Sequence, residues 1–88
     1  MTINITDLKK KIIYRSNYRG TKEMDKLLGS FVTKHIDELI DNELFLLCDL
    51  LDVDDENLYK LNQGHETSIK FMNNRVTNLF KDFVYKKE

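Results

Sequence analysis

Three side chains of this sequence have the chemistry of a nucleophile or a metal ligand: His35, Cys48 and His65. They lie 13 and 17 residues apart, so none belongs to a pair with the close spacing of zinc ligands. No serine or cysteine forms a recognisable catalytic arrangement with a histidine, and the three isolated glycines cannot make a phosphate-binding loop. The sequence therefore predicts neither catalytic residues nor a metal site, and it favours a binding protein over an enzyme.

The positions of His35 and Cys48 favour structural roles for both. His35 falls on the apolar stripe of an expected helix, which is typical of a packed, hydrogen-bonded histidine. Cys48 is interpreted as a small core residue. Because it is the single cysteine, an internal disulfide is excluded and the reducing cytoplasm is the expected compartment.

A further candidate for metal binding is a run of four acids, Asp52, Asp54, Asp55 and Glu56. A calcium loop that began at Asp52 would need glycine at its sixth position and glutamate at its twelfth. This chain has Asn57 and Gln63 there. The acids are therefore expected to cap and begin a helix, whose N-terminal end attracts negative charge.

The most unusual polar stretch is Arg19-Gly20-Thr21-Lys22-Glu23, which interrupts a sequence that otherwise favours helix. Gly20 is well placed as the left-handed residue that ends one helix, and Thr21 as the cap of the next. Two interpretations of the charges remain open. Arg19 can pair with Glu23 and stiffen the corner. Alternatively, its planar guanidinium can bind a carboxylate or backbone carbonyls of a partner that approaches closely at Gly20.

The elements that must position these residues are helices. The absence of proline and the recurrence of apolar residues at intervals of three and four predict an all-α fold, a compact bundle of about five short helices. The expected boundaries are a first helix from Thr6 to Tyr18 capped by Thr6 or Asn4, a second that begins at Thr21, a third capped by Asp41, a fourth that begins at Asp54 or Asp55 and ends at Gly64, and a last one capped by Thr67 or Ser68.

The last of these helices has the most regular apolar face, formed by Ile69, Met72, Val76, Leu79, Phe80 and Phe83. The most buried side chains are expected to include Phe31, Leu47, Leu51, Leu79 and Phe83. The chain has 88 residues, of which 41% are hydrophobic, and it shows no repeat or linker. Residues 1–88 are therefore expected to form a single domain.

Charge is distributed unevenly along the chain, although the net charge is −1. Residues 1–26 carry seven Lys/Arg against three Asp/Glu, residues 27–58 one against nine, and residues 59–88 six against three. This order indicates distinct charged faces and not the uncompensated basic stripe of a nucleic-acid binder. No segment reaches the roughly 20 apolar residues of a membrane span. The N-terminus has no apolar signal core either, so no membrane insertion is expected.

The corner also carries a resemblance. Arg19-Gly20-Thr21-Lys22-Glu23, followed by Met24-Asp25 and Phe31, resembles the RGxxE signature of the succinate dehydrogenase FAD-assembly factors, the small bacterial SdhE-type proteins and their mitochondrial relatives. Further on, Leu50-Leu51, Asp54-Asp55 and Leu58-Tyr59 resemble the paired leucines and the acidic-aromatic stretch of that family. The similarity covers roughly residues 8–62.

Two positions depart from the family pattern. Tyr18 stands where a second basic residue is usual before the motif arginine, and Leu61 stands where a tryptophan is common. The first departure bears on whether a double-basic contact is used. The second bears only on local packing, because leucine also fills an apolar site.

The resemblance implies a non-catalytic assembly factor. Such a protein binds the flavoprotein subunit of succinate dehydrogenase, and in some bacteria that of fumarate reductase, and promotes the covalent attachment of FAD to a histidine of that subunit. It implies no cofactor held stably by this chain. The implied partner-binding residues are Arg19 as the contact, Gly20 for close approach and Glu23 for orientation, with Tyr18, Lys22 and Asp25 as secondary candidates.

The alternative class is a small helical regulator, such as a helix-turn-helix DNA binder or an antitoxin-like module. Short helices joined by a glycine corner allow this interpretation. The near-neutral net charge and the acidic middle segment weigh against it, because phosphate contacts dominate the affinity of such proteins for DNA.

Overall fold

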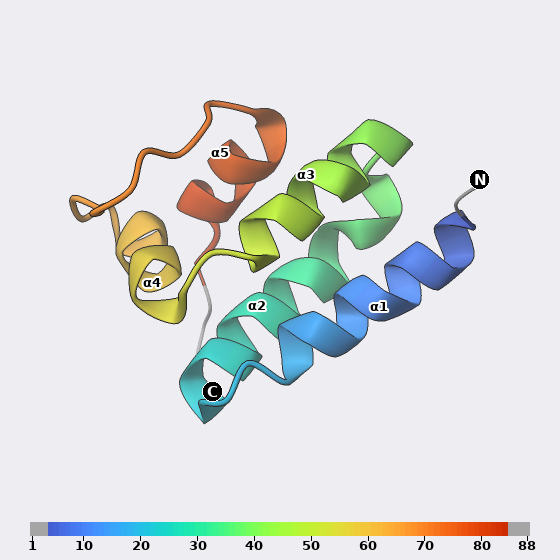
Figure 1. Cartoon of the computed structure of the whole chain (residues 1–88), viewed down its shortest axis with the longest axis horizontal. Helices are drawn as coiled ribbons and strands as arrows, with labels where there is room; N and C mark the ends of the chain where they lie inside the picture. The colour runs from blue at the N-terminus through green and yellow to red at the C-terminus, as the bar shows by residue number, and fades with distance from the viewer. Residues whose placement is uncertain (1–3, 85–88) are drawn as a thin grey trace.

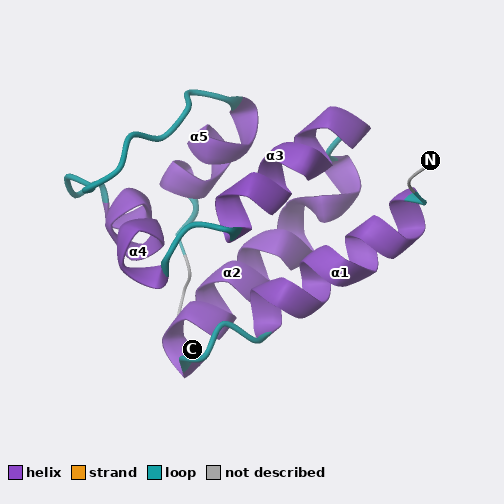
Figure 2. Ribbon diagram, viewed as in Figure 1, coloured by secondary structure: helices purple, strands orange, loops and turns teal. Residues whose placement is uncertain are grey.

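The computed structural model describes residues 4–84, and its regular elements in that range are all helical (Figure 1, Figure 2). In chain order they are α1 (Ile5–Asn17), α2 (Lys22–His35), the short 3-10 helix η1 (Ile36–Glu38), α3 (Asp41–Leu51), α4 (Asp55–Gln63) and α5 (Arg75–Asp82). No strand occurs among the residues that the structure describes. The predicted all-α fold with five short α-helices is confirmed.

The helices form two groups, one of α1, α2 and α3 and one of α3, α4 and α5, and both groups contribute to one core. α1 packs against both α2 and α3, and α5 packs against α3 and α4 (Figure 1). The end of α1 and the end of α3 lie close together, so the α1–α2 corner meets the α3–α4 junction. Two connections that are more than 30 residues apart in the chain therefore become neighbours.

Side chains cap the helices at three of the predicted positions. Asn4, Thr21 and Asp54 accept hydrogen bonds from backbone N–H groups in the first turns of α1, α2 and α4. The prediction that Asp41 caps α3 is wrong. Ile40 occupies that position, and its backbone N–H donates to the Glu43 carboxylate at 3.0 Å. An acid inside the first turn of α3 therefore provides the hydrogen-bond acceptor for the backbone at the start of the helix.

The start of the last helix also differs from the prediction. Thr67 and Ser68 cap no helix, because α5 begins at Arg75 with Asn74 as its cap. Ser68 instead donates from its backbone N–H and its hydroxyl to Oδ1 of the buried Asn57, which ties the α4–α5 loop to α4. Ile69 and Met72, which were expected on the buried face, lie in this loop and are 43% and 75% exposed.

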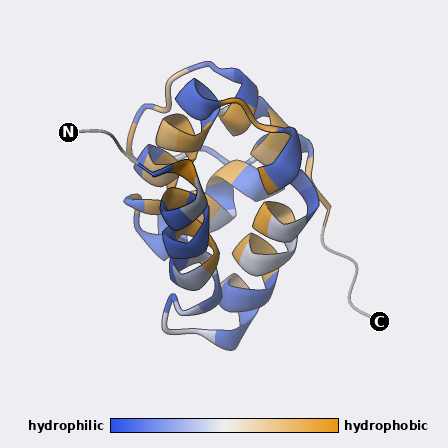
Figure 3. Cartoon of the chain, turned by 90° about the vertical axis from the view of Figure 1, so that its right-hand side faces the viewer, coloured by the Kyte–Doolittle hydropathy of each residue, from blue (hydrophilic) through white to orange (hydrophobic). Residues whose placement is uncertain are grey.

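The core lies where the inner faces of the five α-helices meet, and Figure 3 shows hydrophobic residues on those facing sides. Phe31, Leu47 and Leu51 are at most 2% exposed, as predicted. Leu79 and Phe83 were expected in the same set and are only partly buried. Phe80 takes the central place in α5, with its ring edge-on to Phe31 at a centroid distance of 5.1 Å. Phe83 follows the last residue of α5, and its ring packs at the edge of the core, 5.4 Å from that of Phe31 between centroids.

Candidate functional site

The α1–α2 corner is built from four residues between two helices. α1 ends at Asn17, and Gly20 has a φ of +111°, a conformation that side chains with a Cβ rarely adopt. Thr21 then caps α2 by accepting from the N–H of Met24. Apart from Gly20 and its two chain neighbours, no atom of residues 4–84 lies within 4 Å of the point where a Cβ of Gly20 would stand. Glycine is therefore required there by the backbone conformation and not by crowding.

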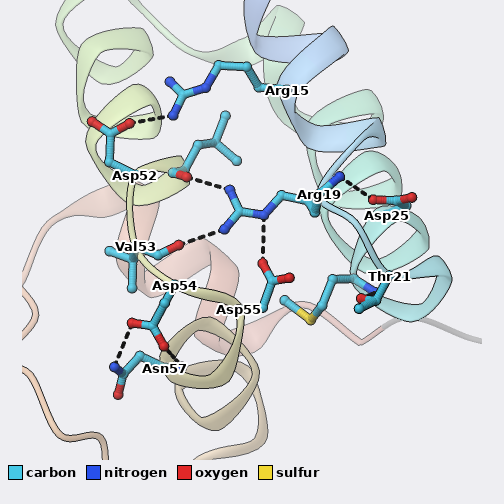
Figure 4. A network of polar contacts seen from close by, with 11 residues as sticks. Arg15, Arg19, Thr21, Asp25, Asp52, Val53, Asp54, Asp55 and Asn57 are labelled. Carbon is cyan, nitrogen blue, oxygen red and sulfur yellow. Dashed lines mark hydrogen bonds and ion pairs between the residues drawn. The ribbon is translucent and has the colours of Figure 1, made fainter.

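The Arg19 side chain turns inward from this corner onto the α3–α4 junction (Figure 4). Its Nε donates to Oδ1 of Asp55 at 2.8 Å, and one terminal nitrogen donates to the carbonyl of Val53 at 2.6 Å. The other terminal nitrogen donates to the carbonyl of Leu51, the last residue of α3. The rigid fork of a guanidinium suits such a set of acceptors, and a cation is favoured at the C-terminal end of a helix.

This geometry matches neither interpretation of the Arg19 charge in full. The ion pair that forms differs from the one in the first interpretation: Arg19 pairs with Asp55 and not with Glu23, and its side chain is only 11% exposed. A carboxylate and backbone carbonyls do bind the guanidinium, as the second interpretation required, but they belong to the same chain. The role of Arg19 as a partner contact stays a prediction.

Two further contacts fix the corner. The backbone N–H of Arg19 donates to the carboxylate of Asp25, which is half-buried in the first turn of α2. Arg15, in the last turn of α1, pairs with Asp52 just after α3 (Figure 4). The acidic run thus binds other parts of the same chain. Asp54 caps α4, while Asp52 and Asp55 pair with Arg15 and Arg19.

Four of the six predicted site residues face solvent. Gly20, Lys22 and Glu23 are exposed, and Tyr18 is 70% exposed. Arg19 and Asp25 lie behind them and hold the corner in place. The exposed corner therefore presents a positive charge, a negative charge and an aromatic ring around a glycine. A partner protein of complementary shape and charge can bind such a surface.

A pocket of about 660 Å³ adjoins the corner between α2, α4 and the end of α5. Lys22 and Glu23 line it together with Tyr59, Lys81 and Phe83. Sequence reasoning missed this pocket as a site. The sequence contained one indication of it, the resemblance of Leu58-Tyr59 to the acidic-aromatic stretch of the family. Tyr59 lines the pocket from α4, where its side chain is 40% exposed.

The other chemical candidates have structural surroundings. His35 is nearly buried, its Nδ1 lies against the Glu38 carboxylate, and its ring centroid is 5.0 Å from that of Phe31, which confirms the predicted packed histidine. Burial raises the pKa of the Cys48 thiol, which makes the thiol a poorer nucleophile. Within residues 4–84, no group of three or more His, Cys, Asp or Glu side chains is placed to hold a metal ion. None of the described helices is both long and apolar enough to cross a membrane.

Comparison with known proteins assigns this corner a context. Residues 10–84 match the family model described as flavinator of succinate dehydrogenase. The chain is 41% identical over 51 residues to the mitochondrial succinate dehydrogenase assembly factor 2 of Meyerozyma guilliermondii, a match that spans 58% of this chain and 38% of that protein. It is 42% identical over 48 residues to the FAD assembly factor SdhE of Legionella pneumophila, over 54% of this chain and 61% of that protein.

A protein of Dictyostelium discoideum, also named succinate dehydrogenase assembly factor 2, is 48% identical over 40 residues, or 46% of this chain and 28% of its own length. The matched part of the chain thus spans less than two thirds of the length of each of these relatives. No solved structure matches the chain.

Proposed function

The chain belongs to the flavinator of succinate dehydrogenase family, and on that premise we propose that it is a non-catalytic assembly factor that promotes covalent attachment of FAD to the flavoprotein subunit of succinate dehydrogenase. The observation that carries this proposal is the family match over residues 10–84, which includes the corner, the acidic run and all five α-helices except the first turns of α1. The names of the curated relatives, which describe assembly factors, support it.

The proposed contact surface is the α1–α2 corner. Tyr18, Gly20, Lys22 and Glu23 are accessible to a partner, and Gly20 adds no side chain that would keep the partner's backbone at a distance. Arg19 and Asp25 belong to the same surface as the residues that fix its shape. The bond-forming histidine and FAD belong to the partner in this proposal, and this chain holds no cofactor stably.

Positioning is the proposed mode of action. A rigid surface that holds two parts of the flavoprotein in one orientation raises the effective concentration of the reacting groups without chemistry of its own. The corner is suited to this because its backbone is held by both helices and by the α3–α4 junction. We also propose the flavoprotein of fumarate reductase as a second client and the cytoplasm as the place of action, consistent with the half-buried free Cys48.

The test measures the amount of flavin that is covalently attached to the flavoprotein subunit. The flavoprotein subunit is produced with and without this protein, denatured, and examined for in-gel flavin fluorescence. We expect covalent flavin to rise in its presence and to fall with Glu23→Ala, while Glu66→Ala, which removes an exposed glutamate from the α4–α5 loop, acts as wild type. Equal fluorescence with and without the protein would overturn the function. Full activity of Glu23→Ala would remove Glu23 from the contact surface.

The small helical regulator that the sequence also allowed is not taken further. The family match spans most of the chain, and no contact described above favours DNA. A titration with random duplex DNA at low salt is the check, because a DNA binder would show strongly salt-dependent affinity.

A further inference from the structure

The outward face of α1 carries two exposed aromatic rings. Tyr14 and Tyr18 are 66% and 70% exposed, although large apolar side chains usually gain from burial. They lie four residues apart, Tyr14 in α1 and Tyr18 at its C-terminal cap, and their ring centroids are 4.7 Å from each other with an interplanar angle of 34°. The rings therefore pack against each other in a tilted arrangement, and most of the surface of both side chains remains open to solvent.

Such a pair of tyrosines is well suited to binding a protein. Tyrosine is enriched among the residues that dominate interface energies. Each ring restricts the rotamers of the other, so less side-chain freedom is lost when a partner covers the pair. The pair contributes little to the core of this chain, because most of its surface remains exposed.

The charged groups around the pair point to the character of the partner. Lys10 and Lys11 are exposed one turn before Tyr14 on the same side of α1. In contrast, the neighbouring cations Lys9, Arg15 and Arg19 pair with acids of this chain. Asp7 is the carboxylate on this side of α1, and it lies in the first turn, where the helix end offsets its charge. The surroundings of Tyr14 are therefore basic.

The face is continuous with the proposed contact surface. Tyr18 directly precedes Arg19 at the corner, and beyond it Gly20, Lys22 and Glu23 are exposed. A partner bound at the corner would have to lie beside Tyr18. Because the ring of Tyr14 packs against that of Tyr18, the same partner could also contact Tyr14.

We propose that the flavoprotein-binding surface extends from the corner over Lys10, Lys11 and Tyr14. Together with Tyr18, which the corner shares, these residues are here called the α1 aromatic face. The tyrosine pair enters an apolar depression of the flavoprotein, and carboxylates beside that depression pair with the two lysines. This proposal rests on the proposed function, since it names more of the surface that meets the same partner.

The experiment measures binding of the purified full-length protein to the purified flavoprotein subunit. The double variant Tyr14→Ala/Tyr18→Ala should raise Kd by about 30-fold or more. Lys10→Glu/Lys11→Glu should raise Kd by about 10-fold at low salt, with a smaller effect at high salt. Matched controls are Met72→Ala, which removes a 75% exposed side chain of the α4–α5 loop, and Lys70→Glu in the same loop. Both controls should bind as wild type.

The outcomes separate this inference from the proposed function. Failure of the wild type to bind the flavoprotein or to raise covalent flavin overturns both. If the flavoprotein binds the tyrosine double variant as tightly as the wild type, the α1 aromatic face is overturned and Tyr18 leaves the corner surface, while the proposed function stands. If thermal unfolding shows that the double variant is unfolded, the single variants Tyr14→Glu and Tyr18→Ser replace it, and unchanged Kd in both again overturns the inference. A tyrosine-dependent self-association of the free protein, or tyrosine-dependent binding to vesicles of anionic lipid without a change in flavoprotein binding, would also overturn it.

Discussion

The guanidinium of Arg19 binds the carboxylate of Asp55, 36 positions later in the chain, with 2.8 Å between Nε and Oδ1. The same guanidinium donates to the carbonyls of Leu51 and Val53. One side chain of the motif thus joins the α1–α2 corner to the end of α3 and the start of α4 (Figure 4). The motif and the acidic-aromatic stretch, which the sequence shows as two separate signals, form one structural unit.

Arg19→Ala should lower the free energy of unfolding by about 3 kcal/mol, because it leaves a partly buried carboxylate and two carbonyls without their cation. Arg15→Ala is the matched control. The Arg15–Asp52 pair is 40% and 65% exposed at its two side chains, so its loss should cost less than about 1 kcal/mol. Urea denaturation followed by circular dichroism measures both. Equal losses for the two variants would contradict the structural role of Arg19.

The two glycines near the corner should respond differently to alanine. Gly20→Ala should lower the free energy of unfolding by about 1 kcal/mol, because the positive φ of Gly20 disfavours a Cβ. Gly29 lies inside α2, where a new Cβ would stand 2.5 Å from Oδ1 of Asn17. The exposed Asn17 side chain can rotate away, and alanine favours helix by about 1 kcal/mol over glycine. Gly29→Ala should therefore be nearly neutral, and a thermal unfolding series in which Gly29→Ala costs more than Gly20→Ala would contradict this account.

Local patterns predicted the fold well wherever a short stretch decides the outcome. Thr21 and Asp54 cap their helices as expected, and Gly64 ends α4 with a φ of +75°. The pattern failed at residues 65–74, where Ile69 and Met72 have helical spacing but the chain forms a loop. The deciding contact there is tertiary: Ser68 binds the buried Asn57 of α4, and no periodicity in residues 67–83 contains that information.

The site was predictable only in part for the same reason. The corner, the glycine and the caps are local, and the sequence located them. The partner of Arg19 is not local: the nearest acid along the chain is Glu23, whereas the acid that binds Arg19 is Asp55, at the start of α4. Opposite charges in distant segments were visible in the sequence, but which of them meet depends on how α1 and α3 pack.

The cap of α4 should make stability depend on pH in the acid range. Hydrogen bonds from the Asn57 side chain and then from its backbone N–H hold the pKa of Asp54 below its ordinary value of 3.8. A carboxyl group whose pKa is lowered by folding stabilises the fold above its ordinary pKa, and this contribution is lost as the pH falls through the lowered value. The difference in unfolding free energy between wild type and Asp54→Asn should therefore be full at neutral pH and shrink below about pH 3.8.

Urea denaturation between about pH 3 and pH 7 checks this expectation. Asp49→Asn, which removes an exposed carboxylate of α3, controls for the loss of one surface charge. A wild-type advantage over Asp54→Asn that stays constant down to about pH 3 would show that the charge of Asp54 does not matter to the cap.

The last prediction separates the residues that build the corner from those that a partner can reach. Asp55→Asn lies outside the five-residue motif, yet it should lower covalent flavin in the flavoprotein, because Arg19 loses its ionic partner and the corner loses its support. Its defect should follow its loss of stability, and lowering the temperature of the assay should restore activity.

Glu23→Ala should show the opposite behaviour. Glu23 is exposed on the first turn of α2, where the helix end favours its charge by less than about 1 kcal/mol, so its substitution should change the unfolding free energy by no more than that and still lower covalent flavin at every temperature. In-gel flavin fluorescence and thermal unfolding of the same preparations measure both quantities. If Asp55→Asn is fully active despite a measurable loss of stability, the corner does not depend on its contact with α4 for function.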